Sequence, residues 1–367
     1  MAPVHDGPAT RLTTTPYLSI VATSRNDDHG GDLLRRMQIF VDGLLAQCQR
    51  HGLDAELVLV EWNPPADRPR LAEALRWPAD QGPERVRIIE VPPERHRQLR
   101  HSDALPLFQM IAKNVGIRRA RGRFVLATNV DILFSDELMR FLAVRELDPG
   151  RMYRIDRHDV MAEVPSPASL DEQLAYCRTH LLRVHTRAGS LRLRPDGQRA
   201  PAPPRRPRPA RVWRALRQAL RKRRAGPGPA PLHLNGCGDF TLLSRDKWQE
   251  LRGYPELQIF SFNLDSVLCH AAHHAGAREI VLADPMRIYH VEHATGSGWT
   301  PEGEGALFKS LAARGLPWLD HDGLLDWAAE MNRYQAPMIF NGEAWGLADE
   351  PLRETSPARA PLEIGAR

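Results

Sequence analysis

The sequence predicts an α/β fold in which a mainly parallel sheet is flanked by helices. The chain has 367 residues, 42% hydrophobic and 26% charged, which is enough apolar material for a substantial core. Short apolar, β-branched runs alternate with stretches in which apolar residues recur at helical spacing, a pattern typical of βαβ units. Polar clusters follow three of these runs, as expected where parallel strands end at a binding edge.

The first half of the chain, residues 17–150, supplies most of the predicted sheet. Strands are expected at residues 17–23, 56–61, 86–91 and 123–128. Helices are expected at residues 33–48, 70–77, 107–120 and 135–147, with Asp32 and Ser135 as N-caps of the first and the last. Residues 1–16 lack either pattern, so we expect them to form a flexible tail.

The second half continues the same alternation after a connecting segment. Residues 151–160 predict one strand and residues 169–184 a helix, which together make up the connecting segment 151–185. Ordered sequence then resumes over 232–350, with a loop and strand at 233–244, helices at 245–251 and 264–276, and strands at 279–283 and 286–293. Residues 351–367 are rich in Ala, Pro and Glu and are expected to be a second flexible tail.

Residues 186–231 form an insert of different composition. They hold 14 basic residues and one acidic residue, so the net charge of +5 belongs to this insert and the rest of the chain is acidic on balance. Nine of the 31 prolines lie between residues 195 and 231, which predicts disorder or polyproline-like structure. Residues 205–224 fit either a solvated linker or a basic helix on an anionic membrane surface. Nucleic acid is disfavoured, because Trp213 is the one aromatic residue among these charges.

Composition also limits where the protein acts. No stretch reaches the roughly 18 uncharged apolar residues that a membrane helix needs, and the first residues lack the apolar core of a signal peptide. The four cysteines are far apart with no C-x-x-C, which favours buried, reduced thiols over a disulfide framework or a zinc site. We therefore expect a cytoplasmic protein, with peripheral contact at the inner face of the membrane as the option that the basic insert leaves open.

Two short motifs have the residue types of a metal site. Asn129-Val130-Asp131 follows a predicted buried strand, where a carboxylate can hold a hard divalent cation; the alternative is that Asp131 caps the next turn. His290-Val291-Glu292-His293 ends a predicted strand. Residues three apart on a strand face opposite sides, so both histidines can bind one metal only if the chain bends after Val291.

Two isolated acids, Asp239 and Asp265, are candidates for general acid–base work. Asp265 stands at the start of a predicted helix, where it either caps the helix or acts as a base toward a hydroxyl group. Three common motifs are missing: the phosphate loop G-x-x-x-x-G-K-[ST], the G-x-G-x-x-G turn after the first strand, and the G-x-S-x-G nucleophile elbow.

Taken in order, several segments resemble the GT-A glycosyltransferases, specifically the family 2-like group. They cover most of residues 17–150 and 233–293: YLSIVATSRNDD, ELVLVEWNPP, MIAKNVGIRRARGRFVLATNVDILFSDEL, GDFTLLSRDKWQELRGYPE, and NLDSVLCHAAHHAG followed by IYHVEH. The stretch beginning with GDF also resembles the acceptor-side segment of galactosyltransferase-like enzymes. The resemblance implies a GT-A-type, Rossmann-like sheet that binds a nucleotide-sugar donor, and transfer of the sugar to a hydroxyl acceptor on a glycan, glycolipid or metabolite.

The same resemblance implies roles for donor-binding residues. The first-strand loop would contact the base and ribose through Thr23, Ser24, Arg25 and Asn26. Glu61 would face the base, and Lys113 and Asn114 would lie near the diphosphate. Asn129 and Asp131 stand at the D-x-D position, so Asn129 is assigned to donor binding.

Mn²⁺ or Mg²⁺ is the cofactor that the resemblance implies, held by Asp131 together with His290 or His293. Asp265 stands where inverting members carry their base, and Asp239 would orient the acceptor or the donor sugar. Asn129 replaces the first acid of D-x-D, which lowers the charge available to a metal. A nucleotidyltransferase, a retaining transferase and a non-catalytic protein that binds sugar or nucleotide on the same fold remain the alternatives.

Overall fold

The computed structural model describes residues 15–78, 85–194, 200, 230–293 and 303–357. Its strands are β1 (Leu18–Ser24), β2 (Ala55–Trp62), β3 (Val86–Val91), β4 (Phe124–Ala127), β5 (Ile132–Phe134), β6 (Arg151–Ile155), β7 (Arg157–Val160), β8 (Leu181–Thr186), β9 (Gly189–Arg192), β10 (Thr241–Ser244), β11 (Arg278–Leu282), β12 (Ile288–Val291) and β13 (Arg353–Thr355). Its helices are α1 (Leu33–His51), α2 (Leu71–Ala74), α3 (Pro93–His96), α4 (Gln109–Arg119), α5 (Asp136–Ala143), α6 (Leu170–Thr179), α8 (Arg245–Leu251), α9 (Leu264–His274), α10 (Glu304–Ala313) and α11 (His321–Tyr334).

The main sheet has eight strands in the order β11-β6-β10-β4-β1-β2-β3-β13. Strands β4, β1, β2 and β3 run parallel, as do β6 and β11, whereas β10 and β13 are antiparallel to their neighbours. The predicted fold class, α/β with a mainly parallel sheet flanked by helices, is confirmed. The expected flexible tail 351–367 is wrong at its start, because β13 pairs with β3 there.

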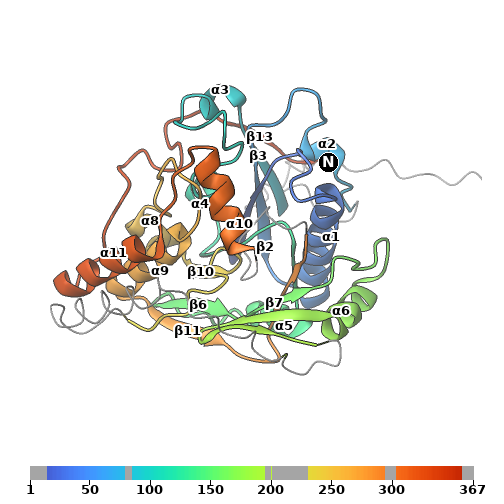
Figure 1. Cartoon of the computed structure of the whole chain (residues 1–367). Helices are drawn as coiled ribbons and strands as arrows, with labels where there is room; N and C mark the ends of the chain where they lie inside the picture. The colour runs from blue at the N-terminus through green and yellow to red at the C-terminus, as the bar shows by residue number, and fades with distance from the viewer. Residues whose placement is uncertain (1–14, 79–84, 195–199, 201–229, 294–302, 358–367) are drawn as a thin grey trace, which may run out of the picture.

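Helices cover both faces of the main sheet, with α1 on one side and α4 on the other (Figure 1). Alternate residues of β1 face opposite sides: Ile20 packs in the cluster that contains Phe40 of α1, and Val21 in the one that contains Val115 of α4. Helix α4 lies so close to the sheet that a Cβ on Gly116 would be 2.5 Å from Val21 Cγ1. The core therefore holds the strand ends in fixed positions.

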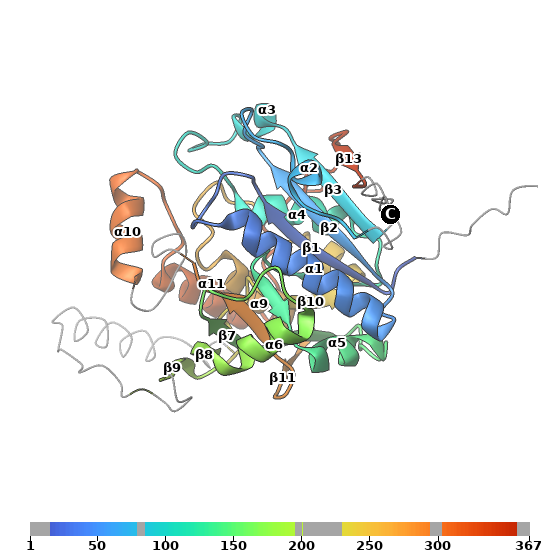
Figure 2. The same cartoon turned by 90° about the vertical axis from the view of Figure 1, so that its right-hand side faces the viewer.

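A second sheet has five strands in the order β5-β12-β7-β8-β9. Strands β7, β8 and β9 of this sheet are labelled in Figure 2. The predicted single strand 151–160 is wrong, since the chain breaks at Asp156 into β6 of the main sheet and β7 of the small one. The strand divides because its two halves pair with different strands: β6 pairs with β10 and β11, and β7 pairs with β8 and β12.

The predicted helix 169–184 is correct only in its first part. Helix α6 begins at a capping box formed by Ser169 and Glu172 and ends at Thr179. The chain then forms β8, whose pairing with β7 and β9 outweighs the helical pattern of residues 181–184. The expected start of the insert at residue 186 therefore falls inside β8, and β9 occupies residues expected to lack structure.

Two expectations about N-caps meet different outcomes. Ser135 accepts a hydrogen bond from Leu138 N and begins α5, as predicted. Asp32 makes no side-chain cap, and Asp28 Oδ1 instead accepts from Leu33 N at 3.1 Å. The loop curls back because residues Asp28 and Asp32 have positive φ values of 60° and 48°.

Most of the basic insert, residues 195–199 and 201–229, lies outside the described residues, and so does the proposed membrane-facing stretch 205–224. Within the described ranges, no helix combines the length and apolar character needed to cross a membrane. All four cysteines are buried and free of disulfides, as predicted.

Candidate functional site

The pairing of β5 with β12 in the small sheet brings the two candidate metal motifs together. Asp131 follows β4 and immediately precedes β5, which runs antiparallel to β12. In that register Ile132 lies opposite His290, and Val291 N donates to Asp131 O at 2.9 Å. Two segments about 160 residues apart in the sequence thus meet at one end of the sheet.

Asp131, His290 and His293 form what we call the Asp–His cluster, in which one ligand atom of each lies within 4.8 Å of the others. Asp131 Oδ2 is 3.7 Å from His290 Nε2 and 3.4 Å from His293 Nε2. Strand β12 ends at Val291, so His293 is beyond the regular strand and both histidines reach the same carboxylate. The regular strand therefore ends after Val291, as is needed for both histidines to face one partner.

The electrostatics of the Asp–His cluster keep Asp131 ionised. Burial raises its pKa, but the attraction of His290, His293 and Arg36 outweighs burial and holds the pKa of Asp131 below its usual range. Burial lowers the pKa of His290, yet Asp131 and Asp159 leave it raised overall. Asp131 Oδ1 is buried and has no hydrogen-bond partner among the described residues. A buried carboxylate oxygen without a donor is costly, which makes this donor set suitable for a cation.

Arg36 is a site residue that the sequence analysis did not identify. It is 3% exposed, lies in the first turn of α1, and has its Nη1 atom 3.4 Å from Asp131 Oδ2. Its other terminal nitrogen donates to His29 O and to Gly31 O. Arg36 therefore ties the loop between β1 and α1 to the Asp–His cluster. The sequence offered one indication that Arg36 belongs to the site: it lies in the first helical turn after a predicted binding loop.

The four predicted donor contacts of the first strand lie at the carboxyl end of β1: Thr23, Ser24, Arg25 and Asn26. Most of their side chains form hydrogen bonds within the protein. Three are buried and donate within the protein: Thr23 Oγ1 to Val60 O, Ser24 Oγ to Met37 Sδ, and Asn26 Nδ2 to Pro69 O. Arg25 is half-buried, donates from Nε to Asn63 O at 2.7 Å and pairs with Asp27. Arg25 is thus the member of this group that retains access to solvent.

Glu61 is enclosed, being 1% exposed. Its Oε1 accepts from Leu71 N at 3.0 Å, at the start of α2. Burial raises the pKa of Glu61 to about 7; Glu90 adds to this and the Leu71 N–H and Arg70 oppose it. The structure therefore places Glu61 as a buried support for the start of α2.

Lys113 and Asn114 are neighbours on α4 but point to different surroundings. The Lys113 ammonium is fully buried and donates to Gly238 O at 2.7 Å. Burial lowers the pKa of Lys113 to about 8, against the attraction of Asp239, Asp265 and Asp131. The negative charges of all three acids thus act on the Lys113 ammonium.

Asn114, in contrast, is not brought to this site. Its amide exchanges two hydrogen bonds with the backbone of Tyr254 and donates a third to Glu256 Oε1. It is fully buried, so it fixes the turn that follows α8.

Asn129 contacts a carboxylate, which explains why an amide occupies this position. Its Nδ2 donates to Asp239 Oδ1 at 2.5 Å, and its Oδ1 accepts from Gln109 Nε2 at 2.9 Å. Arg157 donates to the other oxygen of Asp239 at 2.7 Å. An aspartate at 129 would face Asp239 with like charge, so the amide stabilises the pair.

Asp265 is half-buried in the first turn of α9. Its Oδ1 accepts from Ser266 N at 2.9 Å, and a Cβ on Gly238 would lie 3.0 Å from its Oδ2. Burial raises the pKa of Asp265, although Cys237, Ser266 N–H and Lys113 lower it. A carboxylate with a raised pKa is a candidate for a general base.

A buried polar network that the sequence analysis missed lies behind the Asp–His cluster. Asp159 of β7 is fully buried and forms ion pairs with Arg157 and Arg183 at 2.8 and 2.7 Å. Arg157 bridges Asp159 and Asp239 and so joins this network to the Asn129 contact. These residues lie in the range predicted as a connecting segment, where no motif distinguished them.

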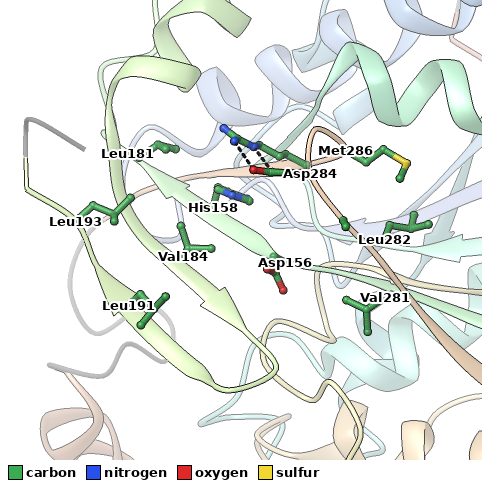
Figure 3. A pocket seen from close by; sticks show the side chains of 12 residues that line it. Asp156, His158, Leu181, Val184, Leu191, Leu193, Val281, Leu282, Asp284 and Met286 are labelled. Atoms are coloured by element: carbon green, nitrogen blue, oxygen red, sulfur yellow. Dashed lines mark hydrogen bonds and ion pairs between the residues drawn. The ribbon is translucent and has the colours of Figure 1, made fainter. Parts of the chain in front are cut away.

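A pocket of about 480 Å³ lies against the opposite face of the small sheet. Figure 3 shows His158 of β7 and Val184 of β8 on its wall, with the ion pair between Asp284 and Arg287 at one side. Because His158 alternates with Arg157 and Asp159 along β7, the pocket is separated from the Asp–His cluster by the sheet itself.

The fold and the cluster together define an α/β protein with a candidate cation site at the end of its parallel strands. No protein-family model matches the chain, and no curated protein matches it. A solved structure, the catalytic domain of Drosophila beta1,4galactosyltransferase 7 in complex with xylobiose, is similar at 11% sequence identity with a TM-score of 0.35. The similarity covers 76% of this chain and 71% of that chain.

Proposed function

We propose that this protein is a glycosyltransferase that moves a sugar from a nucleotide-sugar donor to a hydroxyl acceptor. The observation that carries the proposal is the Asp–His cluster at the end of the parallel strands, with Lys113 donating to Gly238 O, next to Asp239 in the sequence. The ligands of open parallel sheets bind at that edge. The order of the segments that resemble GT-A glycosyltransferases supports the same function.

Asp131, His290 and His293 are the residues that would hold Mn²⁺ or Mg²⁺. Their mixed carboxylate and imidazole donor set favours Mn²⁺ over Mg²⁺, which prefers oxygen ligands. The buried, unpartnered Asp131 Oδ1 fits such an ion. A bound divalent cation supplies positive charge where a nucleoside diphosphate leaves.

Asp265 is assigned as the base of an inverting transfer. Its carboxylate accepts the proton of the acceptor hydroxyl while that oxygen bonds to the anomeric carbon and the bond from that carbon to the diphosphate oxygen breaks. Asp239, held by Asn129 and Arg157, orients a sugar hydroxyl by accepting its hydrogen bond. Lys113 fixes the loop between these two acids through Gly238 O.

The test combines binding with turnover. Thermal-shift measurements with nucleoside diphosphates and nucleotide sugars, with and without Mn²⁺, identify the donor, since a ligand that binds only the folded state raises its apparent stability. With that donor, Asp265→Asn is expected to reduce transfer or donor hydrolysis at least about 100-fold while binding is kept. Asp246→Asn, in the first turn of α8, is the matched control and is expected to leave turnover unchanged. Full turnover in Asp265→Asn would refute the assignment.

A non-catalytic nucleotide- or sugar-binding protein is the second candidate. The specific observation in its favour is Asn129, which replaces an acid of the D-x-D pattern and is engaged with Asp239. Nucleotide binding with no turnover in the unmodified protein would support this candidate.

A further inference from the structure

The network behind the Asp–His cluster faces one of the two histidines. Asp159 lies directly opposite His290 in the pairing of β7 with β12. The Asp159 Oδ1 atom is 3.4 Å from His290 Nδ1, while His290 Nε2 is the nitrogen near Asp131. His290 therefore stands between two carboxylates, one at each ring nitrogen.

This arrangement decides which nitrogen of His290 can bind a cation. Nε2 offers a lone pair only when the ring proton is on Nδ1, and an acceptor at Nδ1 stabilises that tautomer. His290 Nδ1 and Asp159 Oδ1 are both buried and make no hydrogen bond in the described part of the chain, so each is the nearby polar atom left for the other at 3.4 Å. Arg157 Nε is 2.8 Å from the same oxygen as an ion-pair partner, which keeps Asp159 charged.

The β8–β9 hairpin holds Asp159 in this position. Asp159 Oδ2 accepts from Arg183 Nε at 2.7 Å and lies 2.8 Å from His185 Nε2. The other ring nitrogen of His185 lies 2.7 Å from Ser190 Oγ on β9. Asp159 Oδ1 thus contacts β7 and β12, through Arg157 and His290, and Oδ2 contacts β8. With both oxygens engaged, the carboxylate cannot rotate freely.

We propose that Asp159 is a positioning residue for cation binding, and that the β8–β9 hairpin sets its orientation through Arg183, His185 and Ser190. Asp159 directs the lone pair of His290 Nε2 toward Asp131, so that the Asp–His cluster offers its ligands without rearrangement. The inference rests on the cation site of the proposed function and deepens it, by assigning the control of cation affinity to a hairpin outside the cluster. Outer partners of metal-binding histidines typically change metal affinity 10- to 100-fold.

The test is the Mn²⁺ dissociation constant of the full chain, measured by the electron paramagnetic resonance of free Mn²⁺. Asp159→Asn is expected to weaken binding about 10- to 100-fold. The matched control is Asp136→Asn, because Asp136 also contacts a histidine and an arginine, His51 at 2.8 Å and Arg50 at 3.2 Å, away from the cluster. The control is expected to leave Mn²⁺ affinity unchanged.

A double-mutant cycle separates positioning from general loss of structure. Asp159→Asn should cause no further loss of Mn²⁺ affinity in a His290→Ala background, but should keep its effect in a His293→Ala background. Because Asp159 is fully buried, the test also needs a variant that disturbs the structure less. Ser190→Ala is this second variant: Ser190 is half-buried, and the change removes its hydroxyl contact with His185. We expect a several-fold loss of affinity with an unchanged melting temperature.

The outcomes distinguish this inference from the proposed function. Mn²⁺ binding by the unmodified protein, with equal affinity in folded Asp159→Asn and Ser190→Ala, overturns the positioning role and leaves the cation site standing. An absence of Mn²⁺ binding by the unmodified protein overturns the cation site and the positioning role together.

Discussion

Replacing Glu61 with glutamine should stabilise the protein in a pH-dependent way. The folded state raises the pKa of this carboxyl from its ordinary 4.5 to about 7, chiefly by burial. Between these two pH values the folded protein binds more protons than the unfolded chain. The free energy of unfolding therefore falls as the pH rises through this window, and the full penalty is present above about pH 7.

The size of the effect follows from the same values. The difference between 4.5 and about 7 corresponds to roughly 3 kcal/mol of lost stability at pH 8. Glutamine carries no charge and keeps an Oε1 acceptor for Leu71 N–H. Glu61→Gln should therefore recover up to about 3 kcal/mol at pH 8 and almost nothing at pH 4.5.

Urea unfolding of both proteins at several pH values between 4.5 and 8 measures the difference. Glu330→Gln is the control, since Glu330 is an exposed glutamate on a different helix, α11, and is not among the charges that act on Glu61. A stability difference that does not grow with pH, or a glutamine variant that is less stable at pH 8, would refute the assignment of Glu61 as a buried support of α2.

Two further predictions concern the cluster and the core. Asp131→Ala should remove the Mn²⁺-dependent part of any thermal shift produced by a nucleoside diphosphate, and EDTA should have the same effect on the unmodified protein. A Mn²⁺-dependent shift that persists in Asp131→Ala and is abolished by EDTA would place the cation elsewhere. Gly116→Ala should destabilise the protein by about 1–3 kcal/mol in urea unfolding, because its new methyl group would lie 2.5 Å from Val21 Cγ1. An unchanged stability would show that α4 can move away from the sheet.

Local patterning predicted most of the main sheet. The expected strand 86–91 coincides with β3, and the expected helix 245–251 coincides with α8. Both elements bury side chains in a periodicity that the amino-acid order shows directly, so no knowledge of their neighbours was needed. The candidate acids were also visible, since Asp131 immediately precedes β5 and Asp265 lies in the first turn of α9.

Which strands pair with each other, and which groups bind a polar side chain, could not be predicted from the same patterns. Residues 151–160 look like one strand, but β6 and β7 join different sheets because their neighbours differ. Likewise, Glu61 and Asn114 were candidate ligand contacts, yet burial and hydrogen bonds to Leu71 and Tyr254 enclose them. A polar residue at a strand end can serve a ligand or a neighbouring backbone group, and only the packed structure distinguishes the two.

The sequence by itself determined the α/β order of elements and the residue types of the site, because the alternation of buried and exposed positions is local information. The tertiary structure decided that β5 pairs with β12, which brings His290 and His293 to Asp131, and that β7 places Asp159 behind them. These contacts join segments far apart in the chain. Their register depends on which strands of the small sheet become neighbours, and neither segment carries that information alone.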